Sequence, residues 1–127
     1  WDHSYATKFR DLEFEFALLL LGRVVSKPGG DRLCIDLGYK AVSPDNAGPR
    51  LELLGLGEWK WLGQWEEHLS VETPAAANLA VGDPVYAVPF HVCPTVALHR
   101  ELHVVRNGRA DGVWKVAARD RQMSCER

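Results

Sequence analysis

The stretch Leu102–Gly108, LHVVRNG, decides the fold class of this chain, because it joins a candidate strand to a turn. Asn107-Gly108 is the strongest short turn signal of the sequence, since both residues tolerate a positive φ. The candidate strand Leu102–Arg106 precedes the turn. A second candidate, Val113–Ala118, follows after the gap Arg109–Gly112, which we expect to lengthen the loop. The C-terminal third is therefore predicted to be a β-hairpin.

Similar short runs extend this β pattern towards the N-terminus. Leu12–Leu18 alternates apolar and acidic residues, which predicts a strand with one buried face. Leu19–Val25 is apolar on both sides, as in a strand covered on both faces. Further candidates are strands at Arg32–Leu37, Leu51–Leu54, Trp59–Leu62, His68–Glu72 and Val85–Phe90, and a helical turn at Ala75–Val81. Short strands with frequent turns predict an all-β fold, an antiparallel β-barrel or sandwich with at most one or two short helical turns.

The composition indicates one globular domain. Of 127 residues, 46% are hydrophobic and 25% charged, enough for a single core. The net charge of −2 offers no basic excess for a phosphate backbone, so no nucleic acid is expected as a partner. The longest apolar run, Phe16–Leu21, is too short to span a membrane, and no membrane association is expected. The chain begins at Trp1 rather than Met, so we expect a part of a longer protein. We expect a β domain over residues 1–120 and a polar tail over 121–127.

The stretch Pro89–Thr95, PFHVCPT, carries the clearest candidate chemistry. His91 and Cys93 are two residues apart, and in a strand this spacing places both side chains on one face. Imidazole nitrogen and thiolate sulfur suit Zn²⁺. Two ligands leave such a site open, so water, substrate or another part of the protein would complete it. The alternative is a buried cysteine and a hydrogen-bonded histidine in a core strand.

The three cysteines, Cys34, Cys93 and Cys125, are odd in number and include no C-x-x-C pair. This pattern argues against a disulfide framework. Free thiols favour a reducing compartment, and we therefore expect a cytoplasmic location.

Three further groups have competing interpretations. His99 and His103 are four residues apart, but the nearby turn favours a strand, and we expect solvated surface histidines. Glu66–His68 could perform acid–base work or form a polar strand entrance. Trp59, Trp61 and Trp65 suggest an aromatic patch that could form a stacking platform, although such residues more often fill a barrel core or a subunit interface.

Several blocks together resemble the D-serine dehydratase and D-threonine aldolase family. Residues Pro89–Leu98 resemble the family's metal-binding signature. Residues Arg23–Ser26, followed by Cys34–Asp45, resemble its V-S…D-x-G-x-K-A-x-S-x-D block. Residues Glu66–His68 resemble its E-E-H motif, and Trp114–Arg119 resemble its closing strand. The blocks follow the family's order over Asp2–Arg119. Phe90 and Leu69 depart from the residues usual at their positions in the family. Cysteine rather than aspartate at position 93 favours the dehydratase-like, zinc-using branch.

The resemblance implies a fold-type III pyridoxal-phosphate (PLP) enzyme, in which an alanine-racemase-like TIM barrel is followed by a β domain like this chain. The barrel would be the partner that binds PLP through its lysine, so this chain is expected to hold no cofactor-binding residue and to be inactive alone. His91 and Cys93 would hold zinc or another divalent metal, which could act as a Lewis acid on the β-hydroxyl of a small D-amino acid. The resemblance further implies active-site roles for His68 as a catalytic residue and, more weakly, for Tyr39, Asp45 and Asp36.

Two alternatives remain open from the sequence. One is a non-catalytic β-barrel module for binding or assembly, and the other is a stand-alone hydrolase using His68, which lacks a recognisable nucleophile. A domain that covers a barrel should expose an apolar face when alone. We therefore expect self-association, with the Trp59/Trp61 surface as its candidate site.

Overall fold

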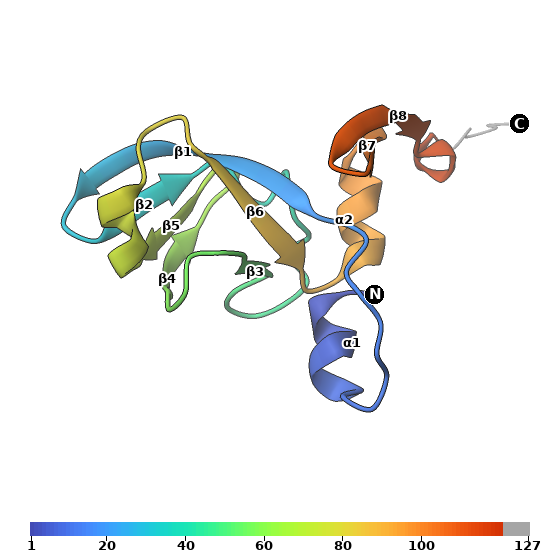
Figure 1. Cartoon of the computed structure of the whole chain (residues 1–127), viewed down its shortest axis with the longest axis horizontal. Helices are drawn as coiled ribbons and strands as arrows, with labels where there is room; N and C mark the ends of the chain where they lie inside the picture. Colours follow the sequence, from blue (N-terminus) through green and yellow to red (C-terminus); the bar gives the residue numbers. More distant parts are fainter. Residues whose placement is uncertain (121–127) are drawn as a thin grey trace, which may run out of the picture.

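A computed structural model describes residues 1–120 of the chain (Figure 1). The polar tail expected at 121–127, and Cys125 within it, lie outside the described residues. The elements, in chain order, are α1 (His3–Lys8), β1 (Leu20–Gly29), β2 (Arg32–Ile35), β3 (Leu51–Leu53), β4 (Lys60–Gln64), β5 (Leu69–Glu72), the 3-10 helix η1 (Pro74–Asn78), β6 (Pro84–Pro89), α2 (Val92–Leu98), β7 (Glu101–Arg106), β8 (Arg109–Lys115) and the 3-10 helix η2 (Ala117–Arg119).

Six strands form one curled sheet, in the order β3-β6-β1-β2-β5-β4, and every neighbouring pair is antiparallel. The strands β7 and β8 form a separate hairpin beside α2, and α1 lies at the same end of the molecule (Figure 1). The prediction of an all-β, antiparallel fold of short strands is confirmed. Helical structure in residues 1–120 is limited to two short helices and two 3-10 turns.

The hydrophobic core is built mainly from the strands of this sheet. Aliphatic side chains from β1, β2, β3, β5 and β6 are almost fully buried, among them Leu33, Ile35, Leu51, Val71 and Ala87. Each fully buried aliphatic side chain of Val, Leu or Ile size stabilises the fold by roughly 1.5–3 kcal/mol relative to an exposed one. The sheet is therefore the rigid frame on which the loops and helices are placed.

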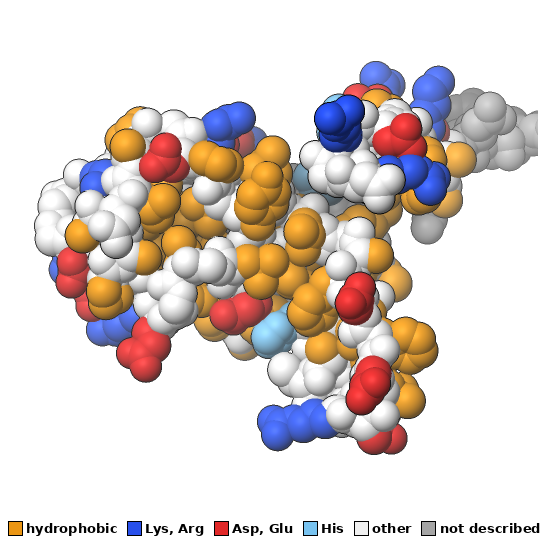
Figure 2. Space-filling model, viewed as in Figure 1, with side chains coloured by type: hydrophobic (Ala, Val, Ile, Leu, Met, Phe, Trp, Pro, Cys, Tyr) orange, Lys and Arg blue, Asp and Glu red, His pale blue; other side chains and the backbone are white. Residues whose placement is uncertain are grey.

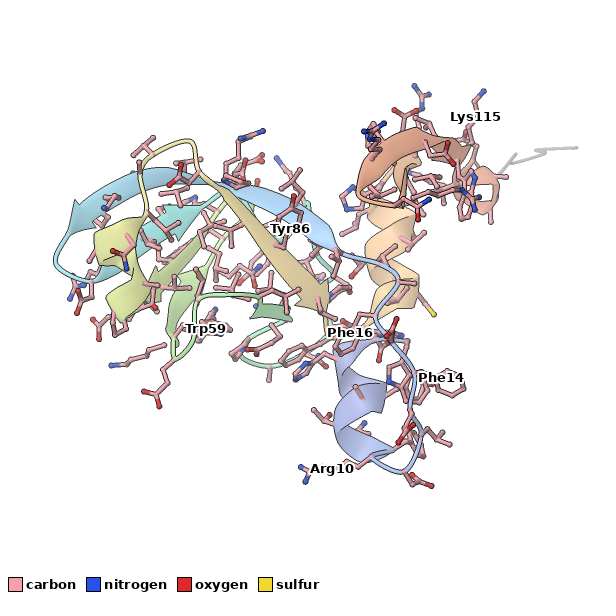
Figure 3. The ribbon with its side chains drawn as sticks, viewed as in Figure 1. Arg10, Phe14, Phe16, Trp59, Tyr86 and Lys115 are labelled. Carbon is pink, nitrogen blue, oxygen red and sulfur yellow. The ribbon has the colours of Figure 1, made fainter. Side chains whose placement is uncertain are left out.

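The strand β1 is buried on one face only, which corrects the expectation for Leu19–Val25. Leu20 and Val24 are buried, whereas Leu21 between them is 57% exposed. Leu21 pairs with Tyr86 of β6, which is also exposed on the outer face (Figure 3). In residues 1–120, Leu21 and Tyr86 thus give this outer face apolar side chains that stay exposed to solvent.

The expected strand Leu12–Leu18 is wrong. The segment has no regular secondary structure, and the sheet begins only at Leu20. Phe14 and Phe16 lie along this segment outside the sheet (Figure 3), and Phe14 packs on the Trp1 ring with centroids 4.9 Å apart. Alternating apolar and polar residues form a strand only where a neighbouring strand supplies hydrogen bonds. This segment connects α1 to the end of the sheet and pairs with no strand in the described part of the chain.

The hairpin is confirmed, with a tighter loop than expected. Asn107 (φ 49°) and Gly108 (φ 73°) both occupy the left-handed region and form the two-residue turn. The gap Arg109–Gly112 belongs to β8 rather than to the loop. A register shift between Val104 and Val105 accommodates one extra residue in β8 as a bulge.

His91 and Cys93 do not share a strand face, which corrects the basis of their predicted pairing. The strand β6 ends at Pro89, and α2 begins at Val92 with His91 as its N-cap residue. Pro94 lies in the first helical turn, where its missing N–H costs no intrahelical bond. The two side chains therefore leave from the junction between a strand and a helix.

The other predicted histidine pair separates. His99 is the C-cap residue of α2 and is half-buried, with Nε2 2.8 Å from the carbonyl oxygen of Ala41. His103 lies in β7 and is exposed. The expectation of surface histidines is therefore correct for His103 and wrong for His99.

Trp59 and Trp61 form no free stacking platform. Both are partly buried and pack against the core, and the Trp59 indole Nε1 donates to Glu52 Oε1 at 3.3 Å. The two tryptophans therefore contribute to the core, as in the alternative interpretation, and self-association through this surface stays a prediction. Within residues 1–120, no helix is long and apolar enough to cross a membrane.

Candidate functional site

The loop between β2 and β3, residues 36–50, joins the predicted site residues. At one end it lies against the β4–β5 turn, where Tyr39 N donates to Trp65 O at 2.8 Å and Lys40 N donates to Glu66 O at 3.0 Å. Gly38 makes this approach possible, because a Cβ atom there would lie 2.2 Å from the carbonyl oxygen of Glu66. The D-x-G-x-K block is thus placed directly beside the E-E-H motif.

At its other end the loop binds the histidine of the metal motif. Nδ1 of His91 donates to Asp45 Oδ2, and Ser43 Oγ donates to Asp45 Oδ1 at 2.9 Å. Burial alone would raise the pKa of the Asp45 carboxyl, but the hydrogen bonds from His91 and Ser43 outweigh it, and the pKa lies below its ordinary value. Asp45 is therefore an acceptor that fixes both the tautomer and the direction of the imidazole.

Thr95 adds a second, backbone link between the loop and α2. Its hydroxyl donates to the carbonyl oxygen of His91 at 2.7 Å and accepts from Ser43 N at 3.2 Å. Thr95 is 1% exposed, so these bonds are shielded from water. Asp45 thus binds the His91 ring directly, whereas Ser43 reaches the His91 carbonyl oxygen only through the Thr95 hydroxyl.

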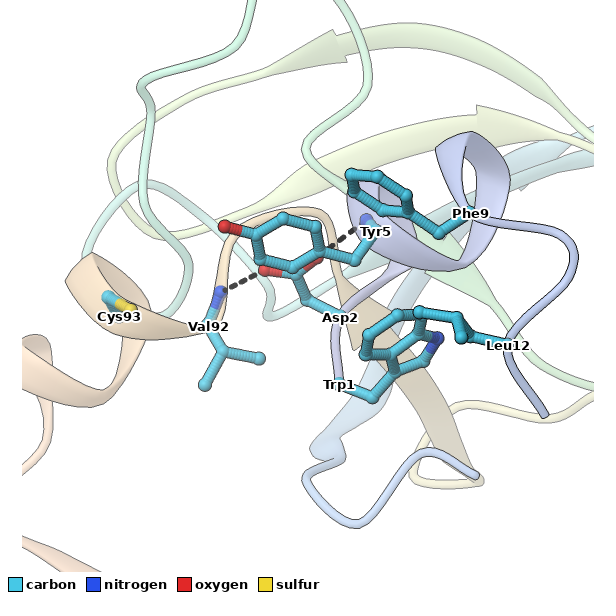
Figure 4. A pocket seen from close by; sticks show the side chains of 7 residues that line it. All are labelled: Trp1, Asp2, Tyr5, Phe9, Leu12, Val92 and Cys93. Atoms are coloured by element: carbon cyan, nitrogen blue, oxygen red, sulfur yellow. Dashed lines mark hydrogen bonds between the residues drawn. The ribbon is translucent and has the colours of Figure 1, made fainter. Parts of the chain in front are cut away.

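Cys93 is exposed and lies in the first turn of α2. Its side chain borders an open hollow of about 380 Å³ between α1 and α2 (Figure 4). The hollow is lined mainly by apolar side chains, which are Trp1, Tyr5, Phe9, Leu12 and Val92, together with Asp2. The thiol is accessible to a ligand from this side.

His91 and Cys93 are the predicted metal ligands, and two protein donors alone could form only an open site. Because Asp45 occupies Nδ1 of His91, Nε2 is the ring nitrogen that remains for a metal, and a carboxylate on the distal nitrogen is the usual support of a metal-binding histidine. The thiol of Cys93 is the second donor. In the part of the chain that the structure describes, no three His, Cys, Asp or Glu side chains converge closely enough to hold a metal ion by themselves.

His68 lies at the turn between β4 and β5, next to the two glutamates of its motif. It is half-buried, and its ring stacks on Trp65 with centroids 5.0 Å apart. Glu66 and Glu67 instead form ion pairs with Lys40, at 3.4 Å for Glu66. The hydrogen bond and the charge of Glu67, followed by those of Glu66, raise the pKa of Lys40 above its ordinary value.

Tyr39 and Asp36, the remaining candidates, have structural contacts. The Arg50 guanidinium carbon lies 4.6 Å from the centroid of the Tyr39 ring, and Arg50 Nη1 donates to Gln64 Oε1 at 3.3 Å. Asp36 accepts from the backbone N–H of Arg23 and continues the pairing of β1 with β2.

Sequence reasoning missed Ser43, Thr95 and Asp2. A local signal exists for each of them. Ser43 is two residues before Asp45, a spacing suited to a side-chain turn, and Thr95 is four residues after His91, within reach of its carbonyl. Asp2 directly precedes α1 in the N-cap position that aspartate favours.

The fold and the site define a curled antiparallel β domain with a histidine and a cysteine at the junction between a strand and a helix. Residues 17–105 match the family model described as "Putative serine dehydratase domain", and the chain belongs to this family. The resemblance found in the sequence motifs is thereby confirmed.

Characterised relatives are aldolases of D-amino acids. The chain is 35% identical over 109 residues to a D-threonine aldolase of an Arthrobacter species, covering 85% of this chain and 28% of that enzyme. It is 36% identical over 107 residues to the 3-hydroxy-D-aspartate aldolase of Paracoccus denitrificans, covering 84% and 27%. The chain thus spans little more than a quarter of the length of these enzymes.

A relative of similar size also exists. The chain is 29% identical over 113 residues to an uncharacterized protein of Mycobacterium tuberculosis, which covers 86% of this chain and 85% of that protein.

Two solved structures share the fold. The D-threonine aldolase from Filomicrobium marinum superposes with a TM-score of 0.75 at 24% identity, over 85% of this chain and 29% of that chain. An alanine-racemase-like protein from Idiomarina loihiensis gives a TM-score of 0.64 at 20% identity, over 76% and 30%.

Proposed function

We propose that this chain is the metal-bearing β domain of a PLP-dependent lyase that acts on a small D-amino acid with a β-hydroxyl group, of the D-serine dehydratase or D-threonine aldolase type. The observation that carries the proposal is the hydrogen bond between His91 and Asp45, which prepares the motif histidine as a ligand. The family match and the D-amino-acid aldolases among the relatives support the same class of reaction.

In this proposal, Nε2 of His91 and Sγ of Cys93 hold a divalent metal, with zinc favoured by the nitrogen–sulfur donor pair. Asp45 keeps the proton on Nδ1, so that Nε2 stays available. When bound, the metal and PLP supply a Lewis acid for the substrate β-hydroxyl and an electron sink for the cleaved bond. We assign proton exchange with the substrate to His68, at the other end of the loop 36–50.

The proposed partner is the PLP-binding TIM barrel of the same enzyme. Hydrophobic side chains gather on the visible face where the sheet meets the two helices (Figure 2). Among the exposed apolar residues of α1 and the following segment are Tyr5 (52% exposed), Phe9, Leu12 and Phe14 (62% exposed). An apolar surface of this kind is suited to being covered by another domain.

A domain exchange tests the proposal. The 127-residue chain would replace the matched quarter of the Arthrobacter D-threonine aldolase, and the product would be assayed for PLP absorbance, metal content and cleavage of D-threonine and D-serine. We expect the hybrid enzyme to show metal-dependent turnover. A hybrid carrying H91A should lose this turnover, whereas one carrying H103A, the matched control at an exposed histidine, should keep it. The proposal would be contradicted if the hybrid enzyme carrying H91A folded, bound PLP and kept its full metal content and turnover.

The chain alone provides a complementary test. With added PLP, zinc and D-threonine or D-serine it should show no turnover, and robust turnover would contradict a role that depends on the barrel.

A non-catalytic binding or assembly module is the second candidate. It is favoured by the Mycobacterium tuberculosis relative, of which this domain covers 85%. This alternative predicts that replacing His91 and Cys93 with alanine leaves both metal content and function unchanged.

A further inference from the structure

Asp2 links the start of α1 to the start of α2. The whole Asp2 residue is 4% exposed. As Figure 4 shows, Oδ1 accepts from Tyr5 N at 2.9 Å and Oδ2 accepts from Val92 N at 3.3 Å. The first bond caps α1, and the second reaches across 90 residues of sequence to the residue between His91 and Cys93.

Two further contacts hold α1 against the same strand–helix junction. Ser4 N donates to the carbonyl oxygen of Phe90 at 3.2 Å, and the His3 ring stacks on the Phe90 ring with centroids 4.4 Å apart and planes 11° apart. Phe90 and Val92 are the two neighbours of His91. Both are therefore bound to the N-terminal segment.

His91 is consequently held from two sides. On one side the Asp45 carboxylate and the Thr95 hydroxyl bind its ring and its carbonyl oxygen. On the other side Asp2 and Ser4 bind the backbone of its neighbours. A buried carboxylate that accepts hydrogen bonds from two backbone N–H groups makes strong, charge-assisted contacts. Asparagine and serine each have only one side-chain oxygen, so neither could replace both acceptors of Asp2.

We propose that Asp2 is a positioning residue for the His91–Cys93 donor pair, fixing the backbone between them so that Nε2 and Sγ face one metal ion. This inference rests on the proposed function, because it concerns the same metal. It assigns a role to a residue that precedes the region matched by the family, residues 17–105.

The test uses D2S in the 127-residue chain. Serine is a good N-cap, so D2S keeps the cap on α1 while removing the second acceptor that binds Val92 N. The matched control is D11N, which removes the charge of an exposed aspartate close to α1. The probe is Co²⁺ alone, followed by its thiolate-to-metal absorption, together with hydrogen exchange at the Val92 amide in the metal-free protein.

We expect faster Val92 exchange in D2S and a Co²⁺ dissociation constant raised about tenfold, the low end for a residue that supports a ligand. The thiolate absorption at saturation should also change in D2S, which a loss of fold stability alone would not cause, and D11N should match the unaltered chain.

Equal Co²⁺ affinity and absorption in D2S and the unaltered chain, with H91A losing binding, would overturn the role of Asp2 and leave the proposed function standing. Unchanged Val92 exchange in D2S would also overturn that role. Absence of His91-dependent Co²⁺ binding in the unaltered chain would overturn the proposed metal site, and the role of Asp2 with it.

Discussion

Asp45 binds Nδ1 of His91 across 46 residues of sequence, and this contact joins the loop between β2 and β3 to the start of α2. The loop is itself bound to the E-E-H turn through Tyr39 and Lys40. Two motifs that are far apart in the chain are therefore connected by one segment.

Replacing Asp45 should weaken metal binding more than it weakens the fold. In D45A the imidazole loses the acceptor that fixes its tautomer, and we expect zinc affinity to fall by about 10- to 100-fold. D45N keeps an oxygen acceptor without the charge and should lie between D45A and the unaltered chain. Zinc titration by calorimetry measures the effect, with D11N as the control. Equal zinc affinity in all four proteins would show that Asp45 does not support the ligand.

Gly38 should be intolerant of any side chain. In G38A the new Cβ would lie 2.2 Å from the Glu66 carbonyl oxygen, and the loop must move away from the E-E-H turn. We expect a loss of about 1–3 kcal/mol in the free energy of unfolding, as for other overpacked sites. Urea unfolding measures it, and A47S, at an exposed position in the same loop, should be nearly neutral. A G38A protein as stable as A47S would disprove the close approach of these two segments.

Thr73 should contribute through its hydroxyl. It is fully buried, its Oγ1 donates to Glu58 O at 2.9 Å, and it accepts from Ala75 N at 3.2 Å as the cap of η1. T73V keeps the shape but leaves these groups unpaired, and should cost about 1–2 kcal/mol. T73S, which keeps the hydroxyl, should cost less. Thermal unfolding of the two variants compares them directly, and the reverse order would contradict the hydrogen-bonding role.

The raised pKa of Lys40 should depend mainly on Glu67. The hydrogen bond and charge of Glu67 are the largest causes of the shift, followed by those of Glu66. NMR titration of the Lys40 side chain should show a larger fall in pKa in E67Q than in E66Q. Because the pKa is raised in the folded state, the pair stabilises the fold below the ordinary lysine pKa of 10.5, and this stabilisation is lost as pH rises through the raised value. A Lys40 pKa that is insensitive to E67Q would contradict the ion pair.

Local chemistry made part of the fold predictable. The Asn107-Gly108 turn could be read from the sequence because a positive φ at two adjacent positions restricts the residue types. The alternation of Leu12–Leu18 was misleading, since period-2 patterning describes a face without guaranteeing a partner strand. The strand–helix junction after Pro89 was missed, although Pro94 is typical of a first helical turn.

The candidate site was predictable in its motifs and not in its contacts. The H-x-C spacing and the family resemblance both point to His91 and Cys93, whereas the resemblance alone points to Asp45. The pairing of Asp45 with His91 depends on how the loop 36–50 packs between the β4–β5 turn and α2, and no local pattern encodes that packing. The same reason explains Asp2, whose cap position is a local signal but whose bond to Val92 is tertiary.

Zinc in crystals of the chain tests the central claim most directly. Crystals grown with and without zinc would be compared by anomalous diffraction at the zinc edge, at a zinc concentration high enough to fill a site with two protein ligands. We predict one zinc ion bonded to Nε2 of His91 at about 2.0–2.1 Å and to Sγ of Cys93 at about 2.3 Å, with Asp45 still on Nδ1. A fully soaked crystal with no zinc at this pair, or with zinc bound elsewhere while His91 contacts only Asp45, would contradict the account.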